Sequence, residues 1–519
     1  MHATSRPSLA DDGYPTHADS APVSVSVSVS GSDDDFNPRQ LLAQTANRIL
    51  SFIEYAKSSP GQLLLRIAWF LVPSFLQGRP VNEKAKLAPT AYLDGMRGLA
   101  ALNVFLCHTG FQAYYPALGW GCGGGYYGFL RLPFLRLMYA GDAAVALFFV
   151  ISGYAISYKP VRMIRSRSTH EFGQAMTSMV FRRGLRLYLP TIASTGLLVL
   201  FLRLGFYEST RAFANDRTYF RHILMTHRTR LDSGLEQWID WAGNVLRSLA
   251  PFAWDSKPHV ANGYDGVTWT IPVEYRCSLY LFLIHMGTSR LKTHYRIMTL
   301  MLFTYITYRK GRWDFLLFLY GLACVEWDYA RGAHTGVSTA ALSQSERGES
   351  KGSRLPLKAI AWNVISILAL YLLSQPSHRR DETPGWVTLE TMIPEYWHEE
   401  RDRYWQCFGA GLFLLSVGHS AFWQRVFTTD VVQYLGKISY SLYLVHGRPT
   451  RWLQFRVLRF VFFYLTGAEG DDYYRGFWLG LCFVFPVVIW CADVFWRAVD
   501  IPIVNFSKWV EKKLMAKDA

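Results

Sequence analysis

The chain has 519 residues, of which 50% are hydrophobic, 16% are aromatic and only 18% are charged. Soluble proteins carry about 25% charged residues, so the composition favours one large membrane-embedded protein over two or three soluble domains. The formal net charge is +15, but the basic residues lie beside apolar segments, as they do in the cytoplasmic loops of membrane proteins. We therefore expect a lipid bilayer as a partner and no nucleic acid.

Residues 1–58 are polar and compositionally biased, with a VSVSVSVS run and an SDDD run. Such a segment buries too little apolar surface to offset the entropy lost on ordering, which predicts a disordered cytoplasmic tail. Residues 59–90 are predicted to form an interfacial helix and linker, because the apolar stretch 63–77 suits a helix that lies on a membrane surface.

Ten apolar blocks of helical length follow in the chain. A helix needs about 20 residues to cross the hydrocarbon layer of a bilayer, and only helices and closed barrels satisfy their backbone hydrogen bonds there. The blocks cover residues 95–115, 139–158, 188–206, 267–287, 295–308, 313–327, 357–374, 404–422, 434–447 and 474–497. The sequence thus predicts an all-α fold, a polytopic membrane helix bundle of about ten transmembrane helices over 91–498, followed by a basic cytoplasmic tail at 499–519.

The charges of the loops set the expected topology. Residues 159–186 hold seven basic residues and one acid, which is typical of a cytoplasmic loop. With ten spans, both termini are then cytoplasmic, and the acid-rich loop 375–403 lies outside. Four arginines within 448–463 fit this topology poorly, which indicates either an amphipathic surface helix or an error in the span count.

The seven cysteines contain no CxxC pair and lie mostly inside the apolar blocks. Their odd number and their spacing fit neither a zinc site nor a disulfide framework. We expect free thiols that pack like small apolar side chains, and no metal site.

The first apolar block carries ionisable side chains. In AYLDGMRGLAALNVFLCHTG, residues 91–110, Arg97 and His108 lie eleven positions apart, which on a helix means about 20° in direction and about 16 Å in height. They therefore share one face, and Asp94 lies on nearly the same stripe, where it can hold the guanidinium in place. Ionisable groups inside a membrane are costly and indicate function by default; an interhelical hydrogen bond for the histidine and snorkelling for the arginine are the structural alternatives.

A buried neutral imidazole suits the removal of a proton from a hydroxyl group. His108 is therefore our candidate general base, close to the middle of the membrane. By spacing alone, the same residue also fits the proton relay of a transporter.

Five motifs occur in a fixed order: YLDGMRGLAALNVFLCH, GDAAVALFFVISGYAIS, FRRGLRLYLP, WTIPVEYRCSLYLF and LGKISYSLYLVHG. They span residues 92–447, and in this order they resemble the acyltransferase-3 family of membrane O-acyltransferases. The C-terminal DIPIVNFSKWVEKK is similar to the fungal branch of that family. The resemblance implies that 91–498 is an acyltransferase-3 membrane domain, in an endomembrane or the plasma membrane of a eukaryote.

The resemblance also implies transfer of an acyl group, usually acetyl from acetyl-CoA, onto a hydroxyl of a carbohydrate or of a small molecule such as a secondary metabolite. Acetyl-CoA is then a co-substrate, and no permanently bound cofactor is expected. The residues that match the family's motifs are Arg97 and His108, Ser152, Gly153 and Tyr154, Trp269 and Glu274, and Arg182, Arg183 and Arg186.

The basic and small residues of these motifs also have a physical interpretation. The arginines of 182–186 stand at the expected cytoplasmic start of a helix, where guanidinium groups bind the phosphates of CoA or anchor the helix at anionic headgroups. Ser152 and Gly153 permit close helix packing, and no adjacent base supports Ser152 as a covalent nucleophile. Asp142, near the outer end of the same helix, either orients the acceptor hydroxyl or caps the helix.

Two further titratable residues lie inside or at the end of apolar blocks. Glu274 needs a partner or a proton there, and Arg276 points away from it by about 200°. We therefore expect its partner on another helix and place Glu274 in the active cavity. His446 is more often an interhelical hydrogen-bonding residue than a second base. The candidate catalytic residues are His108, Glu274 and Asp94, those for CoA are Arg97, Arg182, Arg183 and Arg186, and those for the acceptor are Asp142, Ser152, Tyr154, Trp269 and His446.

These residues predict an integral-membrane O-acyltransferase in which His108 is the general base. The alternative is a proton-coupled multispanning transporter with His108 and Glu274 as relay residues. Acceptor-dependent release of CoA by the purified protein separates the two functions. The sequence sets neither the acceptor, nor the acyl chain length, nor the oligomeric state.

Overall fold

The computed structural model describes residues 60–77, 87–220, 222, 228–249, 263–333 and 357–515. Within these residues the regular secondary structure is helical and contains no strand, which confirms the all-α class. The chain divides into Met1–Pro60 and Gly61–Ala519, and only the second unit is considered below. The tail predicted at 1–58 lies outside the described residues.

Every apolar block of the sequence contains a helix. The long helices are α3 (Ala91–Gly110), α5 (Gly141–Arg165), α6 (Thr169–Arg203), α9 (Thr270–Thr288), α10 (Thr293–Arg309), α11 (Trp313–Ala330), α13 (Leu357–Leu373), α15 (Tyr404–Val417), α17 (Asp430–Val445) and α20 (Gly470–Phe495). Among the described residues, three helices are long and apolar enough to cross a membrane, Gly141–Arg165, Thr169–Arg203 and Gly470–Leu514. They support a membrane protein, whereas the count of about ten spans stays a prediction.

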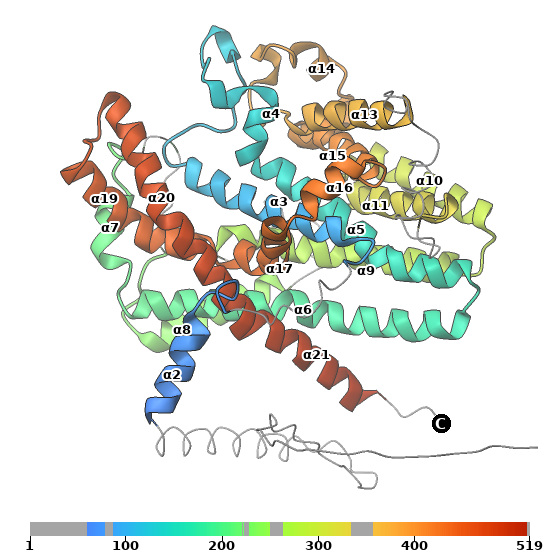
Figure 1. Ribbon diagram of the computed structural model, residues 1–519, viewed down its shortest axis with the longest axis horizontal. Helices are drawn as coiled ribbons and strands as arrows, with labels where there is room; N and C mark the ends of the chain where they lie inside the picture. The colour runs from blue at the N-terminus through green and yellow to red at the C-terminus, as the bar shows by residue number, and fades with distance from the viewer. Residues whose placement is uncertain are drawn as a thin grey trace, which may run out of the picture. The chain divides into compact units, whose positions relative to one another are not determined.

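Shorter helices connect the long ones: α2 (Pro60–Leu71), α4 (Pro133–Arg136), α7 (Glu208–Ala214), α8 (Gly234–Ser248), α14 (Val387–Thr391), α16 (Ala421–Phe427), α18 (Gly447–Pro449), α19 (Phe455–Tyr464) and α21 (Ile501–Leu514). Short 3-10 helices lie at Cys122–Gly124, Phe129–Arg131, Leu137–Tyr139, Gly266–Trp269, Arg380–Glu382 and Glu395–Arg403, and π-helical turns at Thr450–Gln454 and Trp496–Asp500. Figure 1 shows α3, α5 and α17 in the middle of the bundle, with α10, α11 and α13 on one side and α7, α19 and α20 on the other.

The basic segment 159–186 is helical rather than a loop. α5 continues to Arg165 and α6 begins at Thr169. The arginines of 182–186 therefore lie in the middle of α6, and their expected position at the start of a helix is wrong. The polar stretch before them contains no proline, so the helix begins well ahead of the apolar block.

The arginines of 448–463 do not all belong to a surface helix. Arg448 and Arg451 turn inward and pair with the carboxylate of Asp265, Nη2 to Oδ2 at 3.3 Å and Nη2 to Oδ1 at 3.7 Å. Arg456 and Arg459 on α19 are exposed. A surface helix therefore explains only the second pair, because a buried carboxylate holds the first.

The helices α3 and α17 run parallel and in close contact. Gly98 contacts Gly436, and further along both helices the ring of His108 stacks on that of His446. A Cβ atom on Gly98 would lie 2.5 Å from the backbone nitrogen of Gly436, and one on Gly436 would lie 2.5 Å from the carbonyl oxygen of Asp94. Since small residues allow helix backbones to approach, these two glycines set the distance between the helices.

We expect Gly98→Ala to destabilise the folded protein by about 1–3 kcal/mol, because the added methyl group overpacks the contact with α17. Gly110→Ala is the matched control on the same helix, since a Cβ atom there meets nothing within 4 Å. Thermal unfolding of both variants in detergent is the measurement. Equal unfolding temperatures would contradict the role given to the glycine contact.

Candidate active site

A cavity of about 560 Å³ lies among α3, α5, α6, α9 and α17 and receives side chains from all five sequence motifs. Its polar lining consists of Asp94, Arg97, Ser152, Arg183, Arg186, Thr270, Glu274, Gln433, Lys437, Ser439, Tyr440, Tyr443 and Asp500. Ligand sites in proteins have volumes of about 300–1,000 Å³ and a few convergent polar groups. We call this space the motif cavity and take it as the core of the candidate site.

Four cations line the motif cavity, namely Arg97, Arg183, Arg186 and Lys437. Arg97 lies 3.6 Å from Asp94, Nη1 to Oδ1, as the spacing predicted. Arg186 and Lys437 make no hydrogen bond and no ion pair within 4 Å with any residue in the described part of the chain. Asp500, which lines the same cavity, attracts Arg186 without an ion pair within 4 Å. Guanidinium and ammonium groups bind phosphate oxygens readily, so both side chains have hydrogen-bonding capacity left for an anionic ligand.

Glu274 has its partner on another helix, as expected. Its Oε1 accepts hydrogen bonds from Arg183 Nη2 at 2.6 Å and from Ser152 Oγ at 2.9 Å. Arg183 Nε also donates to Ser278 Oγ at 3.1 Å. These bonds join α5, α6 and α9 in the wall of the motif cavity, and the charge-assisted bond fixes the guanidinium of Arg183 there.

Five of the motif residues are not in the described lining of the motif cavity, namely His108, Gly153, Tyr154, Arg182 and Trp269. The last three contact side chains of other helices. Arg182 pairs with Glu511 on α21, Nε to Oε2 at 3.0 Å. Tyr154 is buried and donates a hydrogen bond to Asp328 Oδ2 at 2.7 Å. Trp269 packs edge-on against an aromatic ring of α11. In this structure their contacts hold helices together.

His108 lies at the opposite end of α3 from Arg97 and is not among the described residues that line the motif cavity. The face that the two residues share therefore does not bring both into one cavity. The ring of His108 stacks on that of His446, with centroids 5.4 Å apart and planes at 26°. The ring of Tyr443, which lines the motif cavity, lies 6.3 Å from His446. A single aromatic ring thus stands between the cavity and the histidine pair.

Hydrogen bonds fix both Tyr443 and His446. The hydroxyl of Tyr443 lies 2.6 Å from Thr270 Oγ1 and donates to the carbonyl of Val267 at 2.7 Å. His446 Nδ1 lies 2.9 Å from the carbonyl oxygen of Tyr443. Because a carbonyl only accepts, this contact assigns the hydrogen to Nδ1 and leaves Nε2 as an acceptor in the neutral ring.

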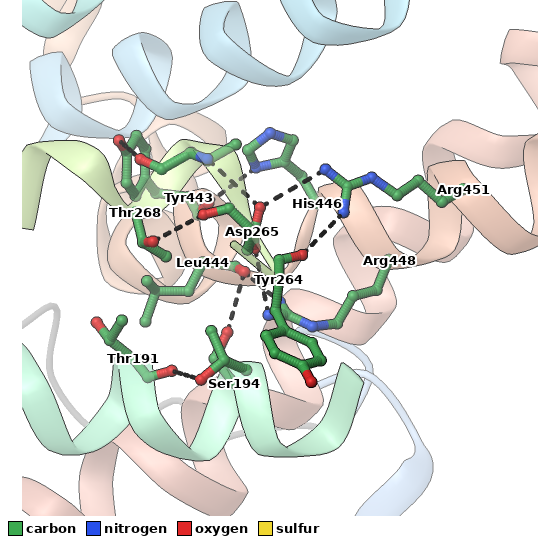
Figure 2. A network of polar contacts seen from close by, with 12 residues as sticks. Thr191, Ser194, Tyr264, Asp265, Thr268, Tyr443, Leu444, His446, Arg448 and Arg451 are labelled. Carbon is green, nitrogen blue, oxygen red and sulfur yellow. Dashed lines mark hydrogen bonds and ion pairs between the residues drawn. The ribbon is translucent and has the colours of Figure 1, made fainter. Parts of the chain in front are cut away.

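A buried charge cluster lies beside His446 (Figure 2). Asp265 is 2% exposed, and its carboxylate pairs with Arg448 and Arg451. Arg448 also donates to the carbonyl of Leu444. The cluster ties the segment before α9 to the C-terminal end of α17, which is the end that carries His446.

Asp142 lies apart from the motif cavity, at the start of α5. It pairs with Arg403, Oδ1 to Nη2 at 2.9 Å, and its Oδ2 accepts a hydrogen bond from Ser377 at 2.6 Å. Burial by itself lowers the pKa of Arg403, but Asp142 and neighbouring acids outweigh burial and hold that pKa above its ordinary value. Asp142 lines a second cavity of about 170 Å³, together with Cys107 and Phe111 near the end of α3.

Sequence reasoning missed Lys437, Tyr443, Asp265 and Asp500. The first two lie inside the LGKISYSLYLVHG motif, so motif membership was an available signal. Asp265 precedes the WTIPVEYRCSLYLF motif without any pattern of its own, and Asp500 falls in the segment interpreted as a tail. Only the packing of distant helices brings these two acids to the site.

Similar proteins are known among fungal enzymes. The chain is 30% identical to O-acetyltransferase PaAT-1 of Phomopsis amygdali over 463 residues, which cover 86% of this chain and 88% of that protein. It is 26% identical to acyltransferase clz18 of Cochliobolus lunatus, over 82% of this chain and 96% of that protein. It is also 26% identical to acyltransferase R4 of a Phoma species, over 82% of this chain and 95% of that protein.

No solved structure matches the chain. The family model described as an acyltransferase domain, that of the acyltransferase-3 family, matches residues 90–497. This range contains the histidine pair and all of the motif cavity except Asp500. The chain therefore belongs to the acyltransferase-3 family and is an acyltransferase.

Proposed function

We propose that the protein is a membrane O-acyltransferase that transfers an acetyl group from acetyl-CoA to a hydroxyl of a carbohydrate or small-molecule acceptor. The observation that carries this proposal is the placement of Arg186 and Lys437. Both cations lack an ion-pair partner within 4 Å among the described residues, and both line a cavity whose Tyr443 contacts the ring of His446, on which His108 stacks. A donor with phosphates at one end and a thioester at the other suits this arrangement.

The donor is expected to lie along α17. Lys437 and Tyr443 are six residues apart, which corresponds to about 9 Å along the helix, and His446 follows one turn later. Phosphates at Arg186, Lys437 and Arg97 would therefore direct the pantetheine arm towards the histidine pair. With the topology expected from the loop charges, the phosphate end faces the cytosol.

His108 acts as general base in the proposed reaction. It takes the proton of the acceptor hydroxyl while the hydroxyl oxygen attacks the carbonyl carbon of the thioester. The new C–O bond forms as the C–S bond breaks, and the leaving CoA thiolate takes up the proton from the imidazolium. His446 holds the plane of His108 by stacking, Asp94 positions Arg97, and Glu274 positions Arg183.

Direct transfer suits the site better than a covalent acyl-enzyme. A serine nucleophile needs a base that accepts its proton. The group that accepts the hydrogen bond of Ser152 is Glu274 Oε1, and the same oxygen already accepts a charge-assisted bond from Arg183, which stabilises the carboxylate as an ion and disfavours uptake of the proton. The described part of the motif cavity contains no histidine. Ser152 is therefore assigned to the cavity wall.

The cations of the motif cavity generate the first functional prediction. Replacing Arg186 or Lys437 by Gln should raise the KM for acetyl-CoA by about 10-fold to 150-fold, because each charge-assisted hydrogen bond to phosphate contributes about 1.5–3 kcal/mol. The KM for acetyl-pantetheine, which lacks phosphates, should stay unchanged. Arg162→Gln, an exposed arginine on α5 outside the cavity, is the control. Equal losses with both donors would contradict phosphate binding at these residues.

The assignment of His108 as general base generates the second functional prediction. His108→Ala should lower kcat by about 100-fold to 10,000-fold, the usual contribution of a general base, while acetyl-CoA still binds. CoA release in the presence of an acceptor and equilibrium binding of acetyl-CoA are the two measurements. His285→Gln is the control, since this histidine is buried and hydrogen-bonds Ser157 away from the site.

If His108→Ala turned over at the wild-type rate, His108 would not be the general base. The proposed binding site for acetyl-CoA would be unaffected by that result. Substrate flux across vesicles without any requirement for CoA would instead support the transporter. The two outcomes are distinguishable because one concerns a single variant and the other concerns the unmodified protein.

A further inference from the structure

Two adjoining cavities lie at the end of α3 that carries His108. The first, the polar chamber, is the space of about 170 Å³ lined by Asp142, Ser377, His378 and Gln406 as well as by Cys107 and Phe111. The second, the apolar annex, has a volume of about 310 Å³ and lies between α3, α20 and the segment 128–139. Both are lined by Tyr114, Tyr115, Pro116 and Tyr139. The two cavities therefore adjoin along these four residues.

The polar chamber contains hydrogen-bonding groups with capacity for a ligand. Gln406 is 1% exposed, and its side-chain oxygen has no hydrogen-bond partner within the part of the chain that the structure describes. A buried acceptor without a partner costs about 1–3 kcal/mol. Asp142 keeps 34% of its side chain accessible although it pairs with Arg403. Both groups accept hydrogen bonds, and a hydroxyl group supplies the matching donor.

The apolar annex offers no comparable groups. Its lining includes Leu106, Phe129, Trp478 and Leu481. Its one charged side chain among the described residues, Arg131, already donates to the carbonyls of Tyr115 and Leu118 at 2.8 and 3.1 Å. The hydroxyl of Tyr139 likewise donates to the carbonyl of Leu130 at 2.8 Å. Besides these, the only N–H and O–H side-chain groups in the described lining are the hydroxyls of Tyr114 and Tyr115 and the indole N–H of Trp478, and the hydroxyl of Tyr115 is bonded to His378. A ligand with hydroxyl groups around its whole surface would therefore lose most of its bonds to water in the annex without replacement.

The polar chamber is also the compartment nearer to the candidate base. The ring of Phe111, which lines the chamber, lies 5.7 Å from that of His108. This mirrors the other side of the histidine pair, where the ring of Tyr443 stands between His446 and the motif cavity. The histidine pair thus lies between two cavities, each one aromatic ring away.

We infer that the polar chamber and the apolar annex together form the acceptor site, and that the acceptor is a compact apolar alcohol rather than a carbohydrate. Its hydroxyl end occupies the chamber beside Phe111 and Gln406, and its hydrocarbon body fills the annex. A carbohydrate carries hydroxyl groups around the whole ring, which the annex cannot satisfy. This inference rests on the proposed function and names the substrate class of the same reaction.

The test compares two classes of acceptor in the full-length protein in nanodiscs with acetyl-CoA. The apolar panel is cyclododecanol, borneol and cedrol, and the polar panel is methyl glucoside and N-acetylglucosamine. We expect kcat/KM to be at least about tenfold higher for the best apolar alcohol, because one hydroxyl left unpaired costs about 1–3 kcal/mol. CoA release and mass spectrometry of the acetylated product are the measurements.

A matched pair of variants locates the site. Leu481→Asn puts an amide into the annex and should raise the KM for the apolar alcohol about tenfold, the effect of losing one buried aliphatic contact, with the KM for acetyl-CoA unchanged. Leu479→Asn, on the same helix but outside the described lining of both compartments, should leave the acceptor KM unchanged. Acetylation of the sugars in preference, or equal behaviour of the two variants, would overturn the acceptor assignment while the acetyl-CoA reaction stands.

A second measurement needs no variant and no turnover. A cycloalkanol that carries a diazirine should label residues 106–116, 128–139 and 477–481 on irradiation, and the corresponding cycloalkane without the hydroxyl should label these segments less. Equal labelling by the two probes overturns the inference, since it reports only apolar surface. A protein that neither binds nor consumes acetyl-CoA would overturn the proposed function, and the acceptor site with it.

Discussion

The parallel contact between α3 and α17 is the constraint on which the rest of the site depends. Gly98 and Gly436 leave no room for a side chain between the two backbones. Because the helices run in the same direction, each contributes a cation to the motif cavity ahead of its histidine, Arg97 in the first half of α3 and Lys437 in the middle of α17. Each also contributes one histidine near its C-terminal end. An antiparallel pair would place the second histidine beside the first cation, and the separation between a phosphate end and a base would be lost.

Buried charges hold the helices around this pair. Removing a charge from water costs several kcal/mol unless an opposite charge and further hydrogen bonds compensate. Glu274 meets Arg183 across α9 and α6, and Asp265 meets Arg448 and Arg451 beside the end of α17. Breaking the pairs of Asp265 would leave an uncompensated buried charge, and breaking that of Glu274 a partly buried one, so their geometry fixes the cavity wall and the position of His446.

The histidine pair is separated from the motif cavity by Tyr443 and from the polar chamber by Phe111. In the proposed reaction a thioester and a hydroxyl arrive from opposite sides and must both reach the same imidazole. His108 itself is partly exposed, so the two rings alone do not keep water from the base. In the proposed reaction, the thioester and the hydroxyl would each have to pass one of these rings to reach it.

The sequence by itself placed a helix in each apolar block, because about 20 consecutive apolar residues satisfy their backbone in lipid as a helix, but it did not show the helices of the basic segment 159–186. It also determined the acyltransferase-3 family, through five motifs in order, and the local pair Asp94 and Arg97, whose spacing is one helical turn.

Only the tertiary structure decided which side chains on different helices contact one another. Glu274 and Ser152 are 122 residues apart in the chain, and the two histidines meet through a packing of helices that no periodicity encodes. The same applies to the arginines of 182–186: one helix carries them all, but Arg183 and Arg186 face the motif cavity and Arg182 faces α21, because the neighbouring helices, and not the sequence pattern, determine which side of α6 is the site.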